Sequence, residues 1–312
     1  MKTNLKRILI TGANGFVGKY LVSELKSHNY YVIGVDVQND SATKVDEYRK
    51  VDIRNSCEVE QLISNISPDG IIHLAAQSDP VVSWIIPQET FLLNVNGGIN
   101  ILDAVRRQSK RIKCLFVGSS TIYSDSNDKL SELSPVSYSS PYSVSKLSLE
   151  QICLLYNKKY NMDIVVTRSF NHVGVGQKEN AAIPSFCKQI IDFENGIIHE
   201  VKVGNIDVSR DFTNVNDIVR AYRMLLETDN TCGIYNVGSG VAISLRIVLQ
   251  TLCSFSKTKI KIVEDKERLR INDNSYVCCD NTKIRETTGW HPLITINASL
   301  KEMYEWYKGE KQ

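Results

Sequence analysis

The stretch Ile8-Leu-Ile-Thr-Gly12-Ala-Asn-Gly15-Phe-Val-Gly18 decides the fold of this chain. An apolar run leads into three glycines spaced three residues apart, and the amphipathic run Tyr20 to Lys26 follows. This order predicts a strand, a tight turn and a helix, and the N-terminus of a helix favours negative charge. The pattern is typical of a site for the pyrophosphate of a dinucleotide. A tight turn without a ligand is the alternative interpretation.

Short β-rich runs alternate with helical stretches up to about residue 170, which predicts a parallel sheet wound on both sides by helices. The expected strands are Arg7 to Ile10, Tyr31 to Val35, Gly70 to Leu74, Lys113 to Gly118 and Asp163 to Arg168. Beyond Phe170 we expect helices at Ile183 to Glu194, Val215 to Glu227 and Leu245 to Ser254, with strands near Lys202, Ile234 and Lys261. The prediction is a doubly wound α/β Rossmann domain over residues 1–170 and a smaller α/β substrate-binding cap over residues 171–312. Part of 211–240 is expected to return to the first domain.

Composition limits the partners. The 312 residues are 42% hydrophobic and carry a formal charge of +2, which gives no electrostatic reason to expect nucleic acid or a membrane as partner. The apolar run that follows Arg7 ends at Gly12, too short for the core of a signal peptide, so we expect a cytoplasmic protein. The eight cysteines form no C-x-x-C pair and are interpreted as reduced, buried hydrophobic side chains, with no metal site.

Polar side chains at the expected strand ends extend the cofactor site. Asp36 follows the second strand, where a carboxylate accepts hydrogen bonds from ribose hydroxyls and repels a 2′-phosphate, so NAD is favoured over NADP. The alternative interpretation of Asp36 is that it only starts a turn. Asp52 and Ile53, after the next short strand, would hold the adenine. His73 is expected to be a hydrogen-bonded strand-end residue, not a catalyst. The predicted cofactor-binding residues are Gly12, Asn14, Gly15, Phe16, Val17, Gly18, Asp36, Asp52, Ile53, Leu74, Ala75, Ala76, Tyr142 and Lys146.

The segment Pro141-Tyr142-Ser-Val-Ser-Lys146 supplies a candidate proton donor. Tyr142 and Lys146 are four residues apart and therefore share one face of a helix that Ser140 caps. An ammonium group near a phenol favours the phenolate, so we expect Tyr142 to exchange a proton near neutral pH. Ser119 ends the preceding strand and could hydrogen-bond a substrate oxygen, although serines after a strand are usually turn residues.

These residues resemble the extended short-chain dehydrogenase/reductase family over nearly the whole chain, and within it the reductases of GDP-4-keto-6-deoxy-mannose, which make GDP-rhamnose. The resemblance implies NAD(P) bound by the glycine motif and chemistry by Ser119, Tyr142 and Lys146. It also implies that Asn94 supports the active site through the neighbouring helix. By the same resemblance, a nucleotide-diphosphate sugar is bound by Ser119, Ser120, Thr121, Asn171, Val203, Gly204, Arg210 and Arg270. Taken singly, each arginine could instead form a surface ion pair.

Three activities remain after one is set aside. Related 4,6-dehydratases place an acid where this chain has Thr121, so we do not expect dehydration. The favoured activity is NAD(P)H-dependent reduction of the 4-keto group of a nucleotide-linked 4-keto-6-deoxy sugar, most simply GDP-4-keto-6-deoxy-mannose. A nucleotide-sugar 4-epimerase with retained NAD uses the same residues, and a non-catalytic dinucleotide-binding redox sensor is the alternative of another class. By analogy, the product would be a deoxysugar for a bacterial surface polysaccharide such as lipopolysaccharide.

The helix that carries Tyr142 is apolar on two sides. Lys146, Leu149, Ile152 and Tyr156 share a face with Tyr142, whereas Val144, Leu147, Leu154 and Leu155 lie on the opposite face. A helix with two apolar faces needs two packing partners. One is expected to be the sheet. The other could be the cap or a second subunit, and we favour a second subunit that forms a shared helix bundle in a homodimer.

Overall fold

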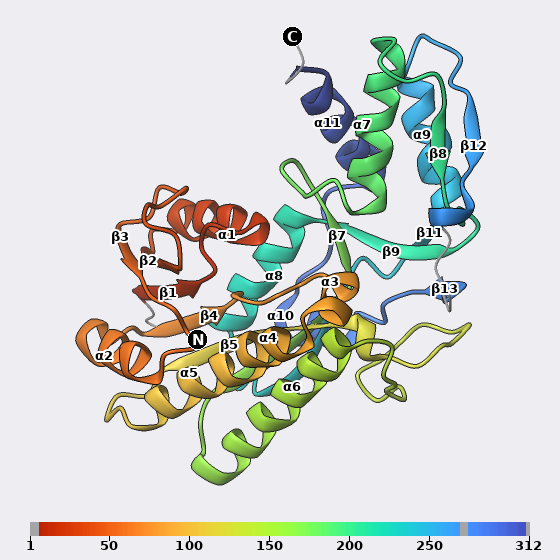
Figure 1. The fold of residues 1–312 in the computed structure, drawn as a ribbon. Helices are drawn as coiled ribbons and strands as arrows, with labels where there is room; N and C mark the ends of the chain where they lie inside the picture. The colour runs from red at the N-terminus through yellow and green to blue at the C-terminus, as the bar shows by residue number, and fades with distance from the viewer. Residues whose placement is uncertain (1–5, 269–273, 310–312) are drawn as a thin grey trace.

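The computed structural model describes residues 6–268 and 274–309. The strands of its main sheet are β1 (Arg7–Thr11), β2 (Tyr31–Asp36), β3 (Glu47–Lys50), β4 (Gly70–His73), β5 (Lys113–Ser119), β6 (Ile164–Ser169) and β10 (Gly233–Val237). All seven are parallel, in the order β10-β6-β5-β4-β1-β2-β3 (Figure 1). The direction of winding reverses between β1 and β4, so the crevice at their carboxyl ends is where a ligand of such a sheet binds. The predicted Rossmann fold is confirmed.

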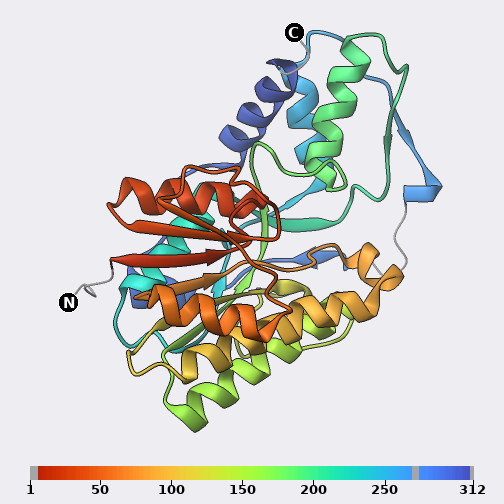
Figure 2. The same cartoon turned by 60° about the vertical axis from the view of Figure 1, so that its left-hand side comes forward.

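Helices cover both faces of this sheet, as Figures 1 and 2 show. One face carries α2 (Ser56–Ile66), α5 (Gly97–Arg106) and α6 (Pro141–Tyr160), and the other carries α1 (Phe16–Ser27), α8 (Val215–Glu227) and α10 (Thr282–Thr288). Each face has its own core of buried side chains, with Ile71, Phe116 and Leu149 in one and Ile10, Leu115 and Tyr222 in the other. Alternate residues of the buried strands therefore point to opposite faces, as the pleat requires.

Between β4 and α5 the chain forms three short elements that were not predicted from the sequence. They are α3 (Pro80–Ile85), α4 (Pro87–Phe91) and the π-helical turn η1 (Leu92–Asn96). A further short turn, the 3-10 helix η2 (Ser120–Ile122), follows β5. Both α3 and α4 pack on α6, so this region borders the helix that carries Tyr142.

The remaining elements build the cap, whose three helices lie at the top of Figures 1 and 2. Its helices are α7 (Ala182–Glu194), α9 (Leu245–Phe255) and α11 (Ile296–Gly309), and its strands are β7 (Asn171–Val173), β8 (Val201–Val203), β9 (Ser209–Asn214), β11 (Ala242–Ser244), β12 (Ile262–Glu264) and β13 (Tyr276–Val277), with the short turn η3 (Lys266–Arg268). A third core, including Ile190, Leu249 and Tyr304, holds the three helices together. Strands β7, β9, β11 and β13 form one small sheet, and β8 pairs with β12.

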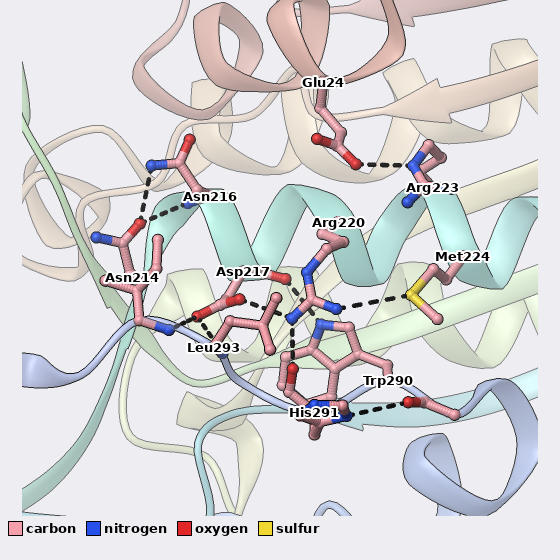
Figure 3. Close-up of polar contacts among 12 residues, drawn as sticks. Glu24, Asn214, Asn216, Asp217, Arg220, Arg223, Met224, Trp290, His291 and Leu293 are labelled. Carbon is pink, nitrogen blue, oxygen red and sulfur yellow. Dashed lines mark hydrogen bonds and ion pairs between the residues drawn. The ribbon is translucent and has the colours of Figure 1, made fainter. Parts of the chain in front are cut away.

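Asp217 ties α8 to the C-terminal segment. Figure 3 shows its carboxylate directed at Arg220 and at the segment of Leu293. One oxygen pairs with Arg220 at 2.7 Å, and the other accepts the backbone N–H groups of Leu293 and Ile294 at 2.9 and 2.8 Å. The indole Nε1 of the buried Trp290 donates to the backbone oxygen of Asp217 at 2.9 Å. Asp217 is itself buried, so these donors satisfy a carboxylate that water does not reach.

All eight cysteines are free thiols, as expected, but not all are buried. Cys57 and Cys232 are exposed, and the expectation of burial is wrong for these two. Cys57 lies in the first turn of α2, on the side opposite the buried Val59 and Leu62. None of the described helices is both long and apolar enough to cross a membrane.

Candidate active site

The three glycines of the first motif form a loop whose backbone leaves no room for side chains. Gly12 has φ = 73°, and a Cβ there would lie 2.9 Å from the backbone nitrogen of Ala75. A Cβ on Gly18 would overlap the backbone oxygen of Gly12. Helix α1 starts after Gly15 without any side-chain cap, so its first N–H groups stay available to an anion. The loop therefore fits the pyrophosphate of a dinucleotide.

Asp36 ends β2 directly beside this loop. Its two carboxylate oxygens accept the backbone N–H groups of Asn14 at 3.1 Å and Val37 at 2.8 Å. These bonds leave lone pairs for ribose hydroxyls. The side chain of Asn14 is committed elsewhere, because it holds the loop after β2 through Gln38, Asp40 and Ala42. Asn14 thus stabilises the wall of the site and offers no free side-chain group to a cofactor.

The side chains of the two residues predicted to contact the adenine, Asp52 and Ile53, are less accessible to a ligand than expected. Arg54 donates three hydrogen bonds of 2.7–3.0 Å to the carboxylate of Asp52, and these bonds lower the pKa of Asp52. The side chain of Ile53 is buried, and a Cβ on Gly97 would lie 2.6 Å from its Cδ1. Both side chains are therefore engaged within the protein.

The segment after β4 lies against the glycine loop. The N–H of Leu74 donates to the backbone oxygen of Thr11, and that of Ala75 to the Thr11 hydroxyl. Ala76 is half-buried next in the chain. His73 is buried and bonds the Thr11 hydroxyl at 2.7 Å, and burial lowers the pKa of His73 to about 3. It is a neutral, hydrogen-bonded strand-end residue.

Phe16 and Val17 lie at the start of α1, where their side chains contact the cap and the core of the sheet domain. The ring of Phe16 stacks on His172 with centroids 6.1 Å apart, and Val17 packs against the core beneath α1. Phe16 therefore brings the glycine loop close to the start of the cap.

Ser119, Tyr142 and Lys146 meet at the carboxyl end of β5. Helix α6 begins as predicted, with Ser140 and Ser143 forming a reciprocal capping box and Pro141 in the first turn. The hydroxyl of Ser119 lies 3.0 Å from that of Thr121, and it is close enough to the phenol of Tyr142 to lower its pKa. Lys146 donates from Nζ to the backbone oxygen of Val117 at 2.8 Å. Ser120 is buried in the adjoining short turn.

The proton affinities differ from the sequence-based expectation. Burial raises the pKa of Tyr142, and the hydrogen bond from Ser119 only partly offsets this. Burial also lowers the pKa of Lys146 to about 8. The expectation that Lys146 lowers the pKa of Tyr142 is therefore wrong for the protein groups alone. Its Nζ lies 5.9 Å from the centre of the phenol ring and binds a carbonyl instead.

Two residues that we did not predict, Ser83 and Ser145, hold Tyr142 in place together with the predicted Asn94. The hydroxyl of Ser83 in α3 accepts the N–H of Tyr142 at 3.1 Å, and the hydroxyl of Ser145 donates to its carbonyl at 2.7 Å. Asn94 donates to Ser145 at 2.9 Å and bonds both backbone groups of Gln77. Asn94 thus contacts α6, and η1, which carries it, is the kind of π-helical turn that recurs at functional sites.

The predicted substrate residues of the cap lie in two places. Asn171 is exposed in β7, which pairs with β9, the strand of Arg210. Arg210 donates to the backbone oxygen of Ser209 at 2.9 Å. Val203 is buried in the cap core, and Gly204 packs against the backbone of Arg268 with no space for a side chain. Arg270 lies outside the described residues.

The parallel sheet, the glycine loop and the Ser119, Tyr142 and Lys146 set define a short-chain dehydrogenase/reductase of the extended type. The sequence model of the family described as GDP-mannose 4,6 dehydratase matches residues 9–303, and the chain belongs to that family. Among the described residues, no group of three or more His, Cys, Asp or Glu could hold a metal ion.

Individual relatives resemble the chain from end to end. It is 31% identical to the GDP-6-deoxy-D-mannose reductase of Pseudomonas aeruginosa over 301 residues, which cover 95% of each chain. It is 29% identical to the GDP-6-deoxy-D-talose 4-dehydrogenase of Aggregatibacter actinomycetemcomitans, covering 96% of this chain and 97% of the relative. The structure of RMD from Pseudomonas aeruginosa complexed with NADPH superimposes with a TM-score of 0.87 at 29% identity, covering 98% of this chain and 99% of that one.

Proposed function

We propose that this protein reduces the 4-keto group of a nucleotide-linked 4-keto-6-deoxy sugar, with GDP-4-keto-6-deoxy-mannose as the favoured substrate. The observation that carries the proposal is Tyr142, a buried phenol near Ser119 that its raised pKa keeps protonated, in the first turn of α6, which packs on β5. The similarity to the GDP-6-deoxy-D-mannose reductase over 95% of both chains supports the same activity. Thr121 offers a hydroxyl where dehydration needs a carboxylate.

Each residue has a definite task in this proposal. Bound NADH supplies the hydride that reduces the carbonyl carbon. Ser119 donates a hydrogen bond to the carbonyl oxygen, and Tyr142 gives its proton to that oxygen as negative charge develops. Lys146 binds the nicotinamide ribose, and Asn171 and Arg210 hold the diphosphate sugar. A protonated phenol is the form that a reduction needs at its start.

The cofactor is proposed to be NADH, bound by the glycine loop and Asp36. Apart from Asp36 itself, the loop from Val37 to Ala42 contains one acidic residue and no basic residue to receive a 2′-phosphate. The structurally similar RMD from Pseudomonas aeruginosa is complexed with NADPH, so the two cofactors must be compared directly.

The deciding experiment mixes the purified protein with NADH and enzymatically generated GDP-4-keto-6-deoxy-mannose. Loss of the near-ultraviolet absorbance of NADH in proportion to added sugar supports the reductase. The product should then be separated by chromatography, because 6-deoxymannose and 6-deoxytalose differ only at carbon 4. Unchanged absorbance, with NAD released only by denaturing the protein, favours the second candidate.

That second candidate is a nucleotide-sugar 4-epimerase. Ser119 and Thr121 form a hydroxyl pair 3.0 Å apart beside Tyr142, and this pair suits repeated proton exchange at one sugar oxygen. An epimerase needs Tyr142 first as a base, whereas its raised pKa favours the acid form. The raised pKa of Tyr142 therefore favours the reductase, and the presence of both Tyr142 and Lys146 disfavours a redox sensor without activity.

Substituting Tyr142 by Phe tests the proton donor. We expect kcat to fall by about 100-fold or more, since general acid catalysis contributes on this order. Binding of NADH should persist, because the hydroxyl is removed without changing the packing of the ring. Fluorescence titration with NADH alongside the turnover assay separates the two effects. Turnover close to that of the unmodified protein would assign the proton to another group.

We also infer a cytoplasmic homodimer in which the outer face of α6 is shared. The exposed side chain of Leu155 on this helix supports the second subunit. A role in the deoxysugars of a bacterial surface polysaccharide such as lipopolysaccharide follows from the proposed substrate.

A further inference from the structure

The loop that leads into α3 touches the cap. The Oδ2 of Asp79 accepts a hydrogen bond from the Nδ2 of Asn180 at 2.6 Å, and Asn180 lies between β7 and α7. The two residues are 101 positions apart, so the contact joins the sheet domain to the cap. Both ribbon views place α3 on the side of the sheet domain that faces the cap (Figures 1 and 2).

Asp79 reaches the N–H group of Tyr142 through α3. Its other oxygen, Oδ1, accepts the N–H groups of Val81 at 2.8 Å and Val82 at 3.3 Å, and so caps this helix. Ser83, which is buried in the same helix, accepts the N–H of Tyr142 at 3.1 Å. The position of α3 is therefore transmitted to the backbone of the proposed proton donor.

A second route reaches the carbonyl group of Tyr142. The side chain of Gln77 bonds both backbone groups of Asp79, at 2.9 and 3.0 Å, and the side chain of Asn94 bonds both backbone groups of Gln77, at 2.8 and 3.0 Å. Asn94 then donates to Ser145, and Ser145 donates to the carbonyl of Tyr142. Asp79 thus stands where two hydrogen-bond routes to Tyr142 and one contact from the cap meet.

We propose that Asp79 and Asn180 are positioning residues, which align Tyr142 with the substrate when the cap holds the sugar nucleotide. The inference rests on the proposed reductase. The diphosphate sugar is held by cap residues, whereas the proton comes from α6 in the other domain. A bond between the two domains that continues to both backbone groups of Tyr142 fixes the distance between donor and acceptor. Small errors in that distance slow proton transfer more than they weaken binding.

The test replaces Asn180 by Asp, which sets a second carboxylate against Asp79. We expect kcat to fall about tenfold, a typical coupling between sites, with little change in the KM for NADH. The solvent deuterium isotope effect on kcat should increase, because proton transfer then limits the rate more strongly. The double variant Asp79→Asn with Asn180→Asp restores a donor–acceptor pair and keeps an Asn at the helix cap, so both values should return. Glu179→Ala, an exposed neighbour, is the matched control.

A second measurement does not depend on activity. The N–H of Tyr142 donates a hydrogen bond to the hydroxyl of Ser83, so its hydrogen-exchange rate reports on this contact. The exchange rate should be higher in Asn180→Asp than in the Glu179→Ala control. In the double variant it should equal the rate of the unmodified protein. Asp79→Ser keeps a residue that caps helices well but removes the second oxygen, and should match Asn180→Asp. If the unmodified protein does not oxidise NADH, the proposed function is overturned. The hydrogen-exchange rate of the Tyr142 amide still tests whether the contact between Asp79 and Asn180 positions Tyr142. Unchanged exchange and kcat in Asn180→Asp would show that the contact does not position Tyr142.

Discussion

Lys146 is buried beside the proposed proton donor, and burial lowers its pKa to about 8. Its charged form is therefore lost as the pH rises through about 8, whereas Tyr142, whose pKa is raised, keeps its proton. We expect kcat/KM for NADH to decline above about pH 8, because the ammonium group that we propose binds the ribose is lost. In Lys146→Arg, whose charge persists, any residual activity should show no decline there. A pH profile of both proteins checks this, and the same decline in Lys146→Arg would assign it to another group.

The same lysine has a consequence for folding. Its pKa in the folded protein lies below the ordinary value, so between about pH 8 and that value the unfolded chain binds more protons than the folded one. The contribution of Lys146 to stability therefore increases with pH in this window, and the buried charge is a cost near neutrality. A residue that destabilises the fold at working pH is typical of a functional site.

At the residue scale, Asp36 is the residue that we propose selects NADH over NADPH. Replacing it by Asn removes the negative charge, while the side-chain oxygen can still accept the N–H of Asn14 or Val37. We expect the ratio of kcat/KM for NADPH over NADH to rise by about tenfold or more, because repulsion of a 2′-phosphate is lost. Asp40→Asn in the same loop is the control and should leave the ratio unchanged. An unaltered ratio in Asp36→Asn would place the selectivity elsewhere.

At the scale of elements, the Asp217 cluster of Figure 3 joins α8 to the segment before α11. Asp217→Ala would leave the N–H groups of Leu293 and Ile294 and the guanidinium of Arg220 without the carboxylate. We expect the free energy of unfolding to fall by about 3 kcal/mol. Asp217→Asn should cost less, since one acceptor remains. Thermal and denaturant unfolding measure both, with the exposed Glu286→Ala of α10 as control. A loss no larger than the control's would show that the cluster adds little to stability.

Local sequence signals account for the elements that were predicted. The strands β1, β2 and β5 are apolar, β-rich runs, and α8 has the predicted bounds Val215–Glu227 because its apolar residues recur with the helical period. The elements α3 and η1 were missed because they are short. Val81, Trp84 and Ile85 of α3 are also exposed, which breaks the usual pattern of a buried apolar face.

The residues of the candidate site also separate into those that local sequence patterns predict and those that depend on long-range contacts. Glycine spacing and the Tyr142 to Lys146 interval are local patterns, and the structure brings these residues together at the carboxyl edge of the sheet. The hydrogen bond from Tyr142 to Ser83 joins residues 59 positions apart, so no local sequence pattern predicts it. The raised pKa of Tyr142 was missed for a similar reason, since it depends on burial by several elements that fold around α6.

At the scale of the whole molecule, the outer face of α6 is the surface on which the proposed homodimer depends. Leu155 on this helix is 64% exposed, although Leu149 and Cys153 on the inner side are buried. A second subunit that covers this face would explain the apolar residue, and it would add to the site by stiffening the helix that carries Tyr142. Oligomers of one chain are most often two-fold dimers, so the same face would meet itself.

Replacing Leu155 by Lys should therefore convert the protein from dimer to monomer, because like charges would meet at a self-complementary interface. Light scattering at several concentrations measures the mass. Ile197→Lys, at a residue of the cap that is 62% exposed, is the matched control and should remain a dimer. If α6 is held in place by its partner, the monomer should also lose kcat while its sheet domain still binds NADH. A dimer that persists in Leu155→Lys, or an unmodified protein that is monomeric at every concentration, would place this helix face against solvent.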